Sequence, residues 1–299
     1  HTAMTQIVHF GPGAFHRAHQ AVYTQDAGDG WRIICVSPHS TDTVDALNAQ
    51  NGHYTLVVRG TDETEFCEIT AIASGMSLFR DRARVLSNLT NVATKIVTLT
   101  ITEKAYAPDN TVFQVLVQAL DLRRLKGLLP FTVMSCDNLS GNGTVVRRVL
   151  AKAAQNYEPA LNEWLKKRCT FPSSMVDRIT PATTSALRQE VRDRINRHDA
   201  IPVETEAYSQ WVIEDQFVDG RPAWEKAGAQ FVTDIVPFEQ MKLRMLNGTH
   251  SLLAYCGHLT GKTYVRDVME DPVLVAQISR HMDAAATPLA PGFGMYPQA

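Results

Sequence analysis

The segment 237–253 carries polar residues whose types and spacing could transfer a proton. On a helical wheel with about 100° per residue, Glu239 and His250 lie at about 60° and about 80° from Lys242. Asn247 lies at about 140° from the same lysine, so these four polar residues share one side of the wheel. An amine, a carboxylate, an imidazole and an amide that converge in this way could form a site for general acid–base chemistry.

A helix that begins near Pro237 must position these residues. Proline fits the first turn of a helix, and the negative charge of Glu239 suits its positive end. Apolar surface comes from Met241, Leu243, Met245, Leu246, Leu252 and Leu253. The same pattern also fits a helix whose polar stripe simply faces water, as charged side chains usually do. Periodicity alone leaves both interpretations open.

A glycine turn follows the first apolar run of the chain. Residues 7–10 read as a strand that ends in Gly11-Pro-Gly13, and residues 15–25 read as a helix. Gly11 would permit a tight turn, and Gly13 would let the backbone approach a pyrophosphate at the helix N-terminus. His16 replaces the third glycine of the G-x-G-x-x-G pattern, so an ordinary strand-to-helix turn remains the alternative.

The next predicted strand, residues 31–36, bears on the choice of cofactor. An acidic residue at the end of such a strand would bind the ribose 2′-hydroxyl of NAD. Here the strand is followed by Ser37-Pro-His-Ser40, and no acid occurs before Asp42. NAD and NADP therefore both stay open, with His39 and Ser40 as candidate contacts to a 2′-phosphate.

Predicted strands and helices follow one another along the rest of the chain. The β-branched run 95–101 is typical of a central strand, and residues 131–138 read as another buried strand. Further strands are expected at 54–58 and 68–73, and helices at 42–50, 81–89, 144–156, 159–167 and 185–198, with one more ending at 122–126. This succession indicates an α/β fold with a doubly wound sheet.

Polar residues follow two of these strands, at the sheet edge where ligands bind in doubly wound folds. Thr102 and Glu103 come after the run 95–101, and Asn138 comes after the strand at 131. Packing explains the first pair equally well, and Asp137, Asn138 and Asn142 could instead cap the helix at 144–156. Later in the chain, Asp177 could bind a ligand or could form a surface ion pair with Arg178.

Composition limits the class of protein. The 299 residues are 44% hydrophobic and 20% charged, which is normal for a globular protein with a buried core. The net charge of −2 implies no nucleic-acid partner, and no apolar run approaches the roughly 20 residues needed to span a membrane. The five cysteines are scattered without a Cys-x2-Cys pair, so we expect free thiols in the reducing cytoplasm and neither a zinc site nor a disulfide framework.

Several of these segments resemble one known family. Lys242-x4-Asn247-x2-His250 resembles the catalytic signature of the polyol-specific long-chain dehydrogenases, the mannitol dehydrogenase family. The N-terminal Gly-x-Gly-x-Phe-His-Arg-Ala-His and the Ser-Cys-Asp-Asn-Leu-x-Gly-Asn-Gly from Ser135 are similar to other motifs of that family. The segments 96–106, 171–184 and 211–260 extend the resemblance, although Ala105 replaces a usual glycine.

The resemblance implies the fold and the cofactor site. We expect an N-terminal Rossmann-like domain at 1–184 and a mostly helical substrate domain at 185–299, which is incomplete relative to the family. NAD is the expected cofactor, with NADP not excluded. Its contacts would come from Gly11, Gly13, Ala14, Phe15, Ser37, Thr102 and Glu103.

The resemblance also implies a reaction without a metal. Lys242 would take the proton of a secondary alcohol while a hydride passes to the nicotinamide. Asn138 and Asn247 would donate hydrogen bonds to the reacting oxygen, and His250 and Asp177 would orient substrate hydroxyls. Glu239 would relay the proton to water.

The small-molecule substrate is expected to be a polyol or a sugar acid. The segments 242–251 and 119–128 are most similar to the fructuronate reductase (D-mannonate oxidoreductase) branch, so interconversion of D-mannonate and D-fructuronate is expected first. Mannitol 2-dehydrogenase activity is the second expectation, and a truncated, non-catalytic nucleotide-binding relative is the third. The sequence gives no indication of the oligomeric state.

Overall fold

The computed structural model describes residues 5–260, with side chains as far as Gly248. The chain forms two compact units, His1–Thr233 and Asp234–Ala299. The boundary expected at residue 185 differs from this division, because residues 185–233 supply strands to the sheets of the first unit. Strand β9 (Val203–Glu206) pairs with β3 (Tyr54–Arg59), and β10 (Gln210–Glu214) pairs with β8 (Ser174–Asp177).

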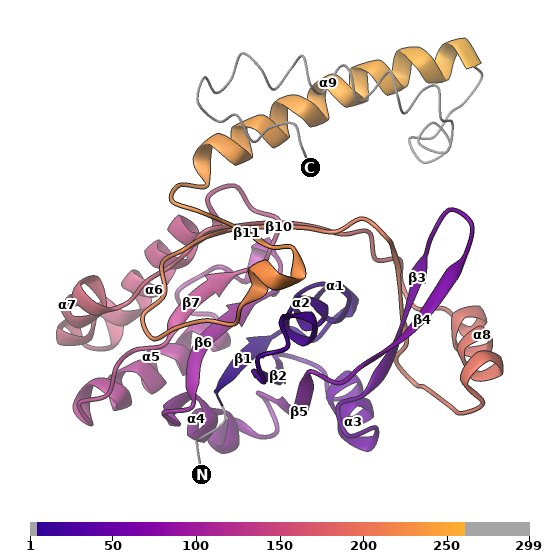
Figure 1. The fold of residues 1–299 in the computed structure, drawn as a ribbon. Coiled ribbons are helices and arrows are strands. Elements are labelled where there is room, and N and C mark those ends of the chain that lie inside the picture. Colours follow the sequence, from indigo (N-terminus) through magenta and orange to yellow (C-terminus); the bar gives the residue numbers. More distant parts are fainter. Residues whose placement is uncertain (1–4, 261–299) are drawn as a thin grey trace. The chain divides into compact units, whose positions relative to one another are not determined.

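A five-stranded parallel sheet forms the centre of the first unit (Figure 1). Its order is β5-β2-β1-β6-β7, with β1 at Gln6–Phe10, β2 at Arg32–Ser37, β5 at Ile72–Ser77, β6 at Thr94–Leu99 and β7 at Thr132–Ser135. The chain builds outward from β1 in both directions, which confirms the predicted doubly wound α/β fold. The order reverses between β1 and β6, and ligands bind at such a switch point in folds of this kind.

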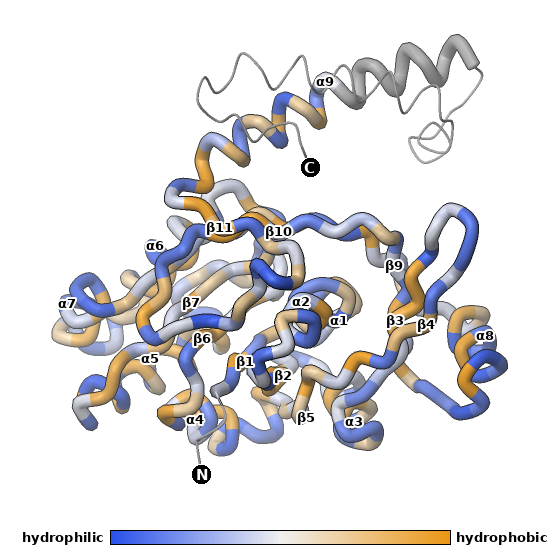
Figure 2. The backbone as a smooth tube through the Cα atoms, in the orientation of Figure 1, coloured by the Kyte–Doolittle hydropathy of each residue, from blue (hydrophilic) through white to orange (hydrophobic). Residues whose placement is uncertain are grey.

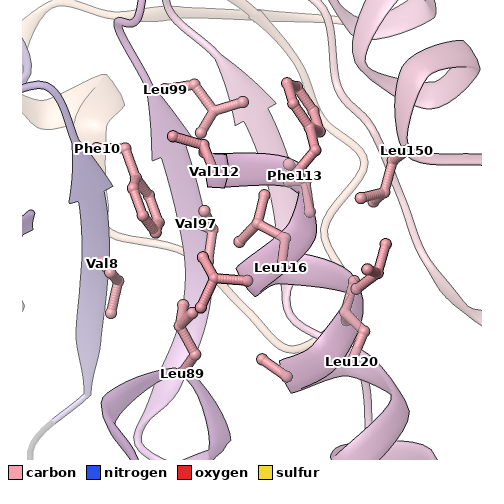
Figure 3. Close-up of a cluster of buried hydrophobic side chains, with 14 of the residues drawn as sticks. Val8, Phe10, Leu89, Val97, Leu99, Val112, Phe113, Leu116, Leu120 and Leu150 are labelled. Atoms are coloured by element: carbon pink, nitrogen blue, oxygen red, sulfur yellow. The ribbon is translucent and has the colours of Figure 1, made fainter. Parts of the chain in front are cut away.

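Four helices cover one face of this sheet: α4 (Arg82–Thr90), α5 (Thr111–Leu125), α6 (Asn142–Tyr157) and α7 (Pro159–Arg168). Alternate residues of β1 and β6, namely Val8, Phe10, Val97 and Leu99, contribute fully buried side chains to the core on this face. Figure 3 shows them opposite Leu89, Val112, Phe113, Leu116, Leu120 and Leu150 from the helices. Burial on both faces explains why these strands read as continuous apolar runs in the sequence.

The other face carries a second core, to which α1 (Ala14–Ala18), α2 (Gln20–Ala27) and α3 (Asp42–Ala49) contribute. Ile7, Ile33 and Ile96 of the sheet share this core with Trp211 and Trp224, which are almost completely buried. The single helix predicted at 15–25 is divided in two at His19, whose backbone (φ −117°, ψ −93°) is not helical.

Two three-stranded sheets complete the first unit. One has the order β4-β3-β9, with β4 at Thr64–Ile69, and the other has the order β11-β10-β8, with β11 at Gln230–Val232. Helix α8 (Ser185–Ile195) buries Leu187 and Val191 in a small core with Val57. The strand predicted at 68–73 is wrong, because the chain leaves the β3–β4 hairpin at Ile69 and enters the central sheet only at Ile72.

The second unit contains helix α9 (Val236–Thr260), the helix predicted to begin near Pro237. The side chain of Asp234 accepts a hydrogen bond from the amide of Val236 at 3.0 Å and caps the first turn. Ile235, Phe238, Met241 and Met245, spaced three or four residues apart, are buried. Figure 2 shows hydrophobic and hydrophilic residues alternating along the first turns of this helix. No helix in residues 5–260 has the length and apolar character needed to cross a bilayer.

Candidate active site

The glycine turn lies at the switch point and depends on contact between β1 and β6. Gly11 has φ +101°, and a β-carbon added there would lie 2.0 Å from the carbonyl oxygen of Thr100. The Thr100 hydroxyl donates a hydrogen bond to the Gly11 carbonyl at 2.7 Å, and the Gly11 amide donates to Val36 at 2.9 Å. Only glycine combines this backbone conformation with so close an approach.

Gly13 lies just before helix α1 and has a different environment. It is exposed, and a β-carbon built on it would meet nothing within 4 Å. Ala14 and Phe15 follow in the first turn of α1, and the ring of Phe15 stacks on His19 with a centroid separation of 5.0 Å. The backbone at Gly13 therefore borders open space just after the C-terminal end of β1, where a dinucleotide pyrophosphate could bind.

The three histidines next to this turn are buried and have structural contacts. His9 contacts the hydroxyls of Thr98 at 2.6 Å and Thr100 at 2.8 Å, and its ring stacks on that of His16 at 3.5 Å. His19 contacts the carbonyl of Gln210 at 2.9 Å. Burial lowers the pKa of His9 to about 3, that of His19 to about 4, and that of His16 well below its usual value. These imidazoles are therefore neutral supports of the turn at pH 7.

Two arginines join helix α1 to segments that lie far from it in the sequence. Arg17 is buried and donates to the carbonyls of Pro12 at 3.0 Å and Ile201 at 2.5 Å. Arg178 donates to the carbonyl of Ala18 at 2.6 Å and also to that of Glu206. The proposed surface pair between Arg178 and Asp177 is absent from the ion pairs of the described residues, so that alternative is wrong.

Ser37 closes β2 and is buried. Its hydroxyl accepts a hydrogen bond from the amide of Ser40 at 3.2 Å, which shapes the turn after the strand. His39 and Ser40 are exposed, and the nearest acids are Asp42 and Asp45, in the first turn of α3. Arg80, which follows the neighbouring strand β5, pairs with Asp45 at 2.8 Å. Two acids and one arginine therefore lie on the elements that follow β2 and β5, and no acid comes from the end of β2 itself.

Thr102 and Glu103 lie exposed just after β6, with Glu103 in the short 3-10 helix η1 (Glu103–Ala105). Thr102 has φ 71° and ψ 157°, a conformation that β-branched residues almost never adopt. Holding a side chain there costs about 1–3 kcal/mol and needs support from neighbouring groups. That support is the carboxylate of Asp137, which accepts hydrogen bonds from the amides of Thr102 at 3.1 Å and Ile101 at 3.0 Å.

Asn138 is the exposed residue that follows Asp137 after β7. The predicted capping role for Asp137, Asn138 and Asn142 is wrong: Gly141 occupies the N-cap position of α6, without a side-chain cap. Asn142 instead is fully buried and joins the end of β7 to β8. Its amide group donates to the carbonyls of Asp137 at 3.1 Å and Ser174 at 2.8 Å, and its oxygen accepts from the Ser174 amide at 2.9 Å.

Asp177 ends β8 and is partly exposed. The strand pairing sets it opposite Gln210 of β10. The Asn142 side chain binds both Asp137, the residue before Asn138, and Ser174, the first residue of β8. One side chain therefore links the end of β7, which Asn138 follows, to the strand that ends at Asp177.

The remaining candidates lie in α9. Glu239 and Lys242 are partly exposed and Asn247 is exposed. His250 belongs to the same helix, but its side chain lies outside the described residues. Helix α9 therefore carries the whole Lys-x4-Asn-x2-His pattern on one continuous element, as the sequence predicted.

The site candidates of the first unit gather at the carboxyl ends of β1, β2, β6 and β7, plus β8 in the neighbouring sheet. Sequence reasoning missed Asp137 as the support of Thr102. The signal available was a carboxylate directly after a buried strand, because the ends of neighbouring parallel strands meet at one edge. In the described part of the chain, no three His, Cys, Asp or Glu side chains are arranged to hold a metal ion.

Comparison with protein families gives two matches. The model described as the mannitol dehydrogenase Rossmann domain matches residues 5–226, and the mannitol dehydrogenase C-terminal domain matches residues 234–295. The gap between the two matches coincides with the boundary between the two compact units.

Individual relatives agree with the family matches. The chain is 40% identical to a D-mannonate oxidoreductase of Escherichia coli over 90% of this chain and 62% of that protein. It is 39% identical to a mannitol 2-dehydrogenase of Aspergillus clavatus over 95% of this chain and 64% of that protein. The chain therefore spans less than two thirds of either relative.

A solved structure of Pseudomonas fluorescens mannitol 2-dehydrogenase, a ternary complex with NAD and D-mannitol, is also similar. The TM-score is 0.81 at 39% identity, and the match covers 99% of this chain and 68% of that one.

Proposed function

This chain belongs to the mannitol dehydrogenase family, and we propose that it is an NAD-dependent oxidoreductase that interconverts a secondary alcohol and a ketone of a sugar acid or polyol. The observation that carries this proposal is that one chain has both features: a glycine turn at the switch point and an intact Lys-x4-Asn-x2-His pattern on α9.

The residues at the switch point fit a dinucleotide. Gly11 must be glycine because of its contact with Thr100, and Gly13 leaves open space where a pyrophosphate would approach the backbone. Ala14 and Phe15 would lie along the pyrophosphate, Ser37 at the ribose end, and Thr102 and Glu103 beside the nicotinamide half. When bound, NAD supplies a hydride acceptor for the alcohol carbon.

The side chains of this protein would handle the proton and the oxygen. We assign Lys242 as the general base that removes the hydroxyl proton of the substrate, and Glu239, one turn earlier, as its relay to water. Asn138 and Asn247 would donate hydrogen bonds to the oxygen as negative charge develops there. Asp177 and His250 would bind neighbouring hydroxyl groups and orient the substrate.

D-mannonate and D-fructuronate are the proposed substrate pair. The support is the 40% identity to a D-mannonate oxidoreductase and the resemblance of segments 242–251 and 119–128 to that branch. Mannitol and fructose are the second candidate pair, supported by the similarity to a mannitol 2-dehydrogenase that binds NAD and D-mannitol. A non-catalytic relative that keeps only nucleotide binding is the third candidate.

The proposal can be tested by following the absorbance of reduced nicotinamide with the purified protein. NADH and NADPH would each be offered with fructuronate, tagaturonate or fructose. We expect turnover of fructuronate with NADH. Turnover of fructose alone would identify mannitol and fructose as the substrate pair. Dinucleotide binding without turnover of any ketone would support the non-catalytic alternative.

The electrostatics at the end of β2 favour NAD within this proposal. A 2′-phosphate would bring about two negative charges close to Asp42 and Asp45, and the guanidinium of Arg80 already pairs with Asp45. We therefore expect a lower KM for NADH than for NADPH, although no acid ends the strand.

A further inference from the structure

We infer that Asp137 is a positioning residue for the cofactor: its carboxylate fixes the loop after β6 in the strained form that presents Thr102 and Glu103 at the switch point. The inference rests on the proposed function, since it assumes that this loop contacts the dinucleotide. Asp137 would not itself touch the cofactor or the substrate, but it would set the geometry of residues that do.

The carboxylate holds the loop through three hydrogen bonds. Oδ1 accepts from the amide of Thr102 at 3.1 Å, and Oδ2 accepts from the amide of Ile101 at 3.0 Å. Oδ2 also accepts from the hydroxyl of Tyr106 at 2.5 Å. Tyr106 follows η1, so Asp137 binds the loop on both sides of Glu103.

Asp137 is itself fixed at the end of β7. Its amide donates to the hydroxyl of Ser135 at 3.2 Å, and its carbonyl accepts from the buried side chain of Asn142 at 3.1 Å. The Ser135 hydroxyl lies 2.6 Å from that of Tyr106, which closes the network. Because both backbone and side chain are held, Asp137 transmits the position of β7 to the loop after β6.

The conformation of Thr102 shows why such a support is needed. At φ 71° and ψ 157° a threonine is unfavourable without external constraint, whereas glycine occupies this region readily. Without the carboxylate, the loop would relax toward an ordinary extended form and move Thr102 and Glu103. Strain held by a neighbouring group at a binding loop is a recognised form of preorganisation.

Asp199 provides a matched comparison in the same unit. It is buried, and its carboxylate also accepts hydrogen bonds from two backbone amides, those of Thr55 at 2.6 Å and Ile201 at 2.9 Å. It supports β3 and the chain before β9, and none of the proposed contact residues is bonded to it. Replacing either aspartate by asparagine weakens hydrogen bonds from two backbone amides to a carboxylate. In Asp137→Asn the amides belong to the loop after β6, and in Asp199→Asn they belong to β3 and to the chain before β9.

The experiment measures NADH affinity by fluorescence titration, and thermal stability by calorimetry, for wild type, Asp137→Asn and Asp199→Asn. Because these hydrogen bonds have a charged acceptor, their loss should be costly, and we expect Asp137→Asn to raise the Kd for NADH by about tenfold or more. The KM for NADH should rise in parallel, with a smaller change in kcat at saturating cofactor. Asp199→Asn should lower the melting temperature but leave the Kd within about twofold.

A second pair of variants separates positioning from a general loss of structure. Glycine at residue 102 needs no support, so Thr102→Gly combined with Asp137→Asn should show a smaller loss of NADH affinity than the sum of the two single changes. Tyr106→Phe, which leaves both amide bonds intact, should weaken NADH binding less than Asp137→Asn does.

Two results would overturn the inference: an unchanged NADH Kd in a folded Asp137→Asn protein, or an equal rise in Asp199→Asn. Failure of wild type to bind either NADH or NADPH would instead contradict the proposed function, and the inference with it.

Discussion

A β-carbon at Gly11 would lie 2.0 Å from the carbonyl oxygen of Thr100, so the turn after β1 packs against the residue that directly follows β6. The contact joins β1 to β6 at the point where the strand order reverses. The glycine is therefore required by the fold, before any ligand is considered.

Alanine at the two glycines of this turn should have opposite consequences. Gly11→Ala introduces a clash with backbone and an unfavourable φ, and should lower the free energy of unfolding by more than about 2 kcal/mol. Gly13→Ala adds a methyl group to open space, so stability should change by less than about 1 kcal/mol. The NADH Kd should nevertheless rise in Gly13→Ala, since the methyl occupies space left for the pyrophosphate. Chemical denaturation and NADH titration check both; an unaltered Kd in Gly13→Ala would contradict the assignment.

The buried histidines predict sensitivity to acid. The folded-state pKa of His19 is lowered by burial to about 4, below the unfolded value near 6.5. The unfolded chain therefore takes up the proton first, so stability is full above about pH 6.5 and is lost as the pH falls toward 4. In this window His19→Phe should reduce the slope of unfolding free energy against pH by up to about 1.4 kcal/mol per pH unit.

Denaturation series at several pH values measure this slope. A slope in His19→Phe equal to that of wild type would show that this imidazole is not kept neutral by burial.

Two asparagines four residues apart should separate stability from catalysis. Asn142→Ala removes hydrogen bonds to the backbone of Asp137 and Ser174 in a buried site, and should cost about 2–5 kcal/mol of stability. Asn138→Ala, at an exposed position, should change stability by less than about 0.5 kcal/mol but lower kcat by roughly 10²–10³-fold. Calorimetry and steady-state kinetics distinguish the two. Normal turnover in Asn138→Ala would remove this residue from the proposed site.

The central sheet was predictable because its strands are buried on both faces. Residues 7–10, 31–36 and 95–101 are dense apolar or β-branched runs, and they became β1, β2 and β6. The two smaller sheets escaped prediction because their pairing is decided by distant segments: β9 pairs with β3 across about 150 residues of chain, and β8, β10 and β11 have three to five residues each. The missed break at Thr70 and Ala71 has the same origin, since a continuous alternating pattern crosses from one sheet to another.

The positions of the candidate residues in the fold were predictable where they end or follow a strand, as for Gly11, Ser37, Thr102 and Asn138. The roles of the residues next to these candidates were not predictable. His16 and His19 belong to the N-terminal motif, and the sequence did not predict that both are buried supports of the turn. Asp137 read as a helix cap, yet its bonds run to the neighbouring strand end. Such contacts join residues far apart in sequence, and the spacing of residue types carries no information about them.

The central claim is that Lys242 is the base of the reaction, and Lys242→Ala tests it most directly. With NADH and the best ketone substrate, we predict a fall in kcat of roughly 10²–10⁴-fold, while the Kd for NADH stays within about twofold of wild type. Lys166→Ala, which removes an exposed lysine paired with Glu163 on α7, should keep wild-type kinetics. Near-normal turnover by Lys242→Ala would contradict the proposed mechanism.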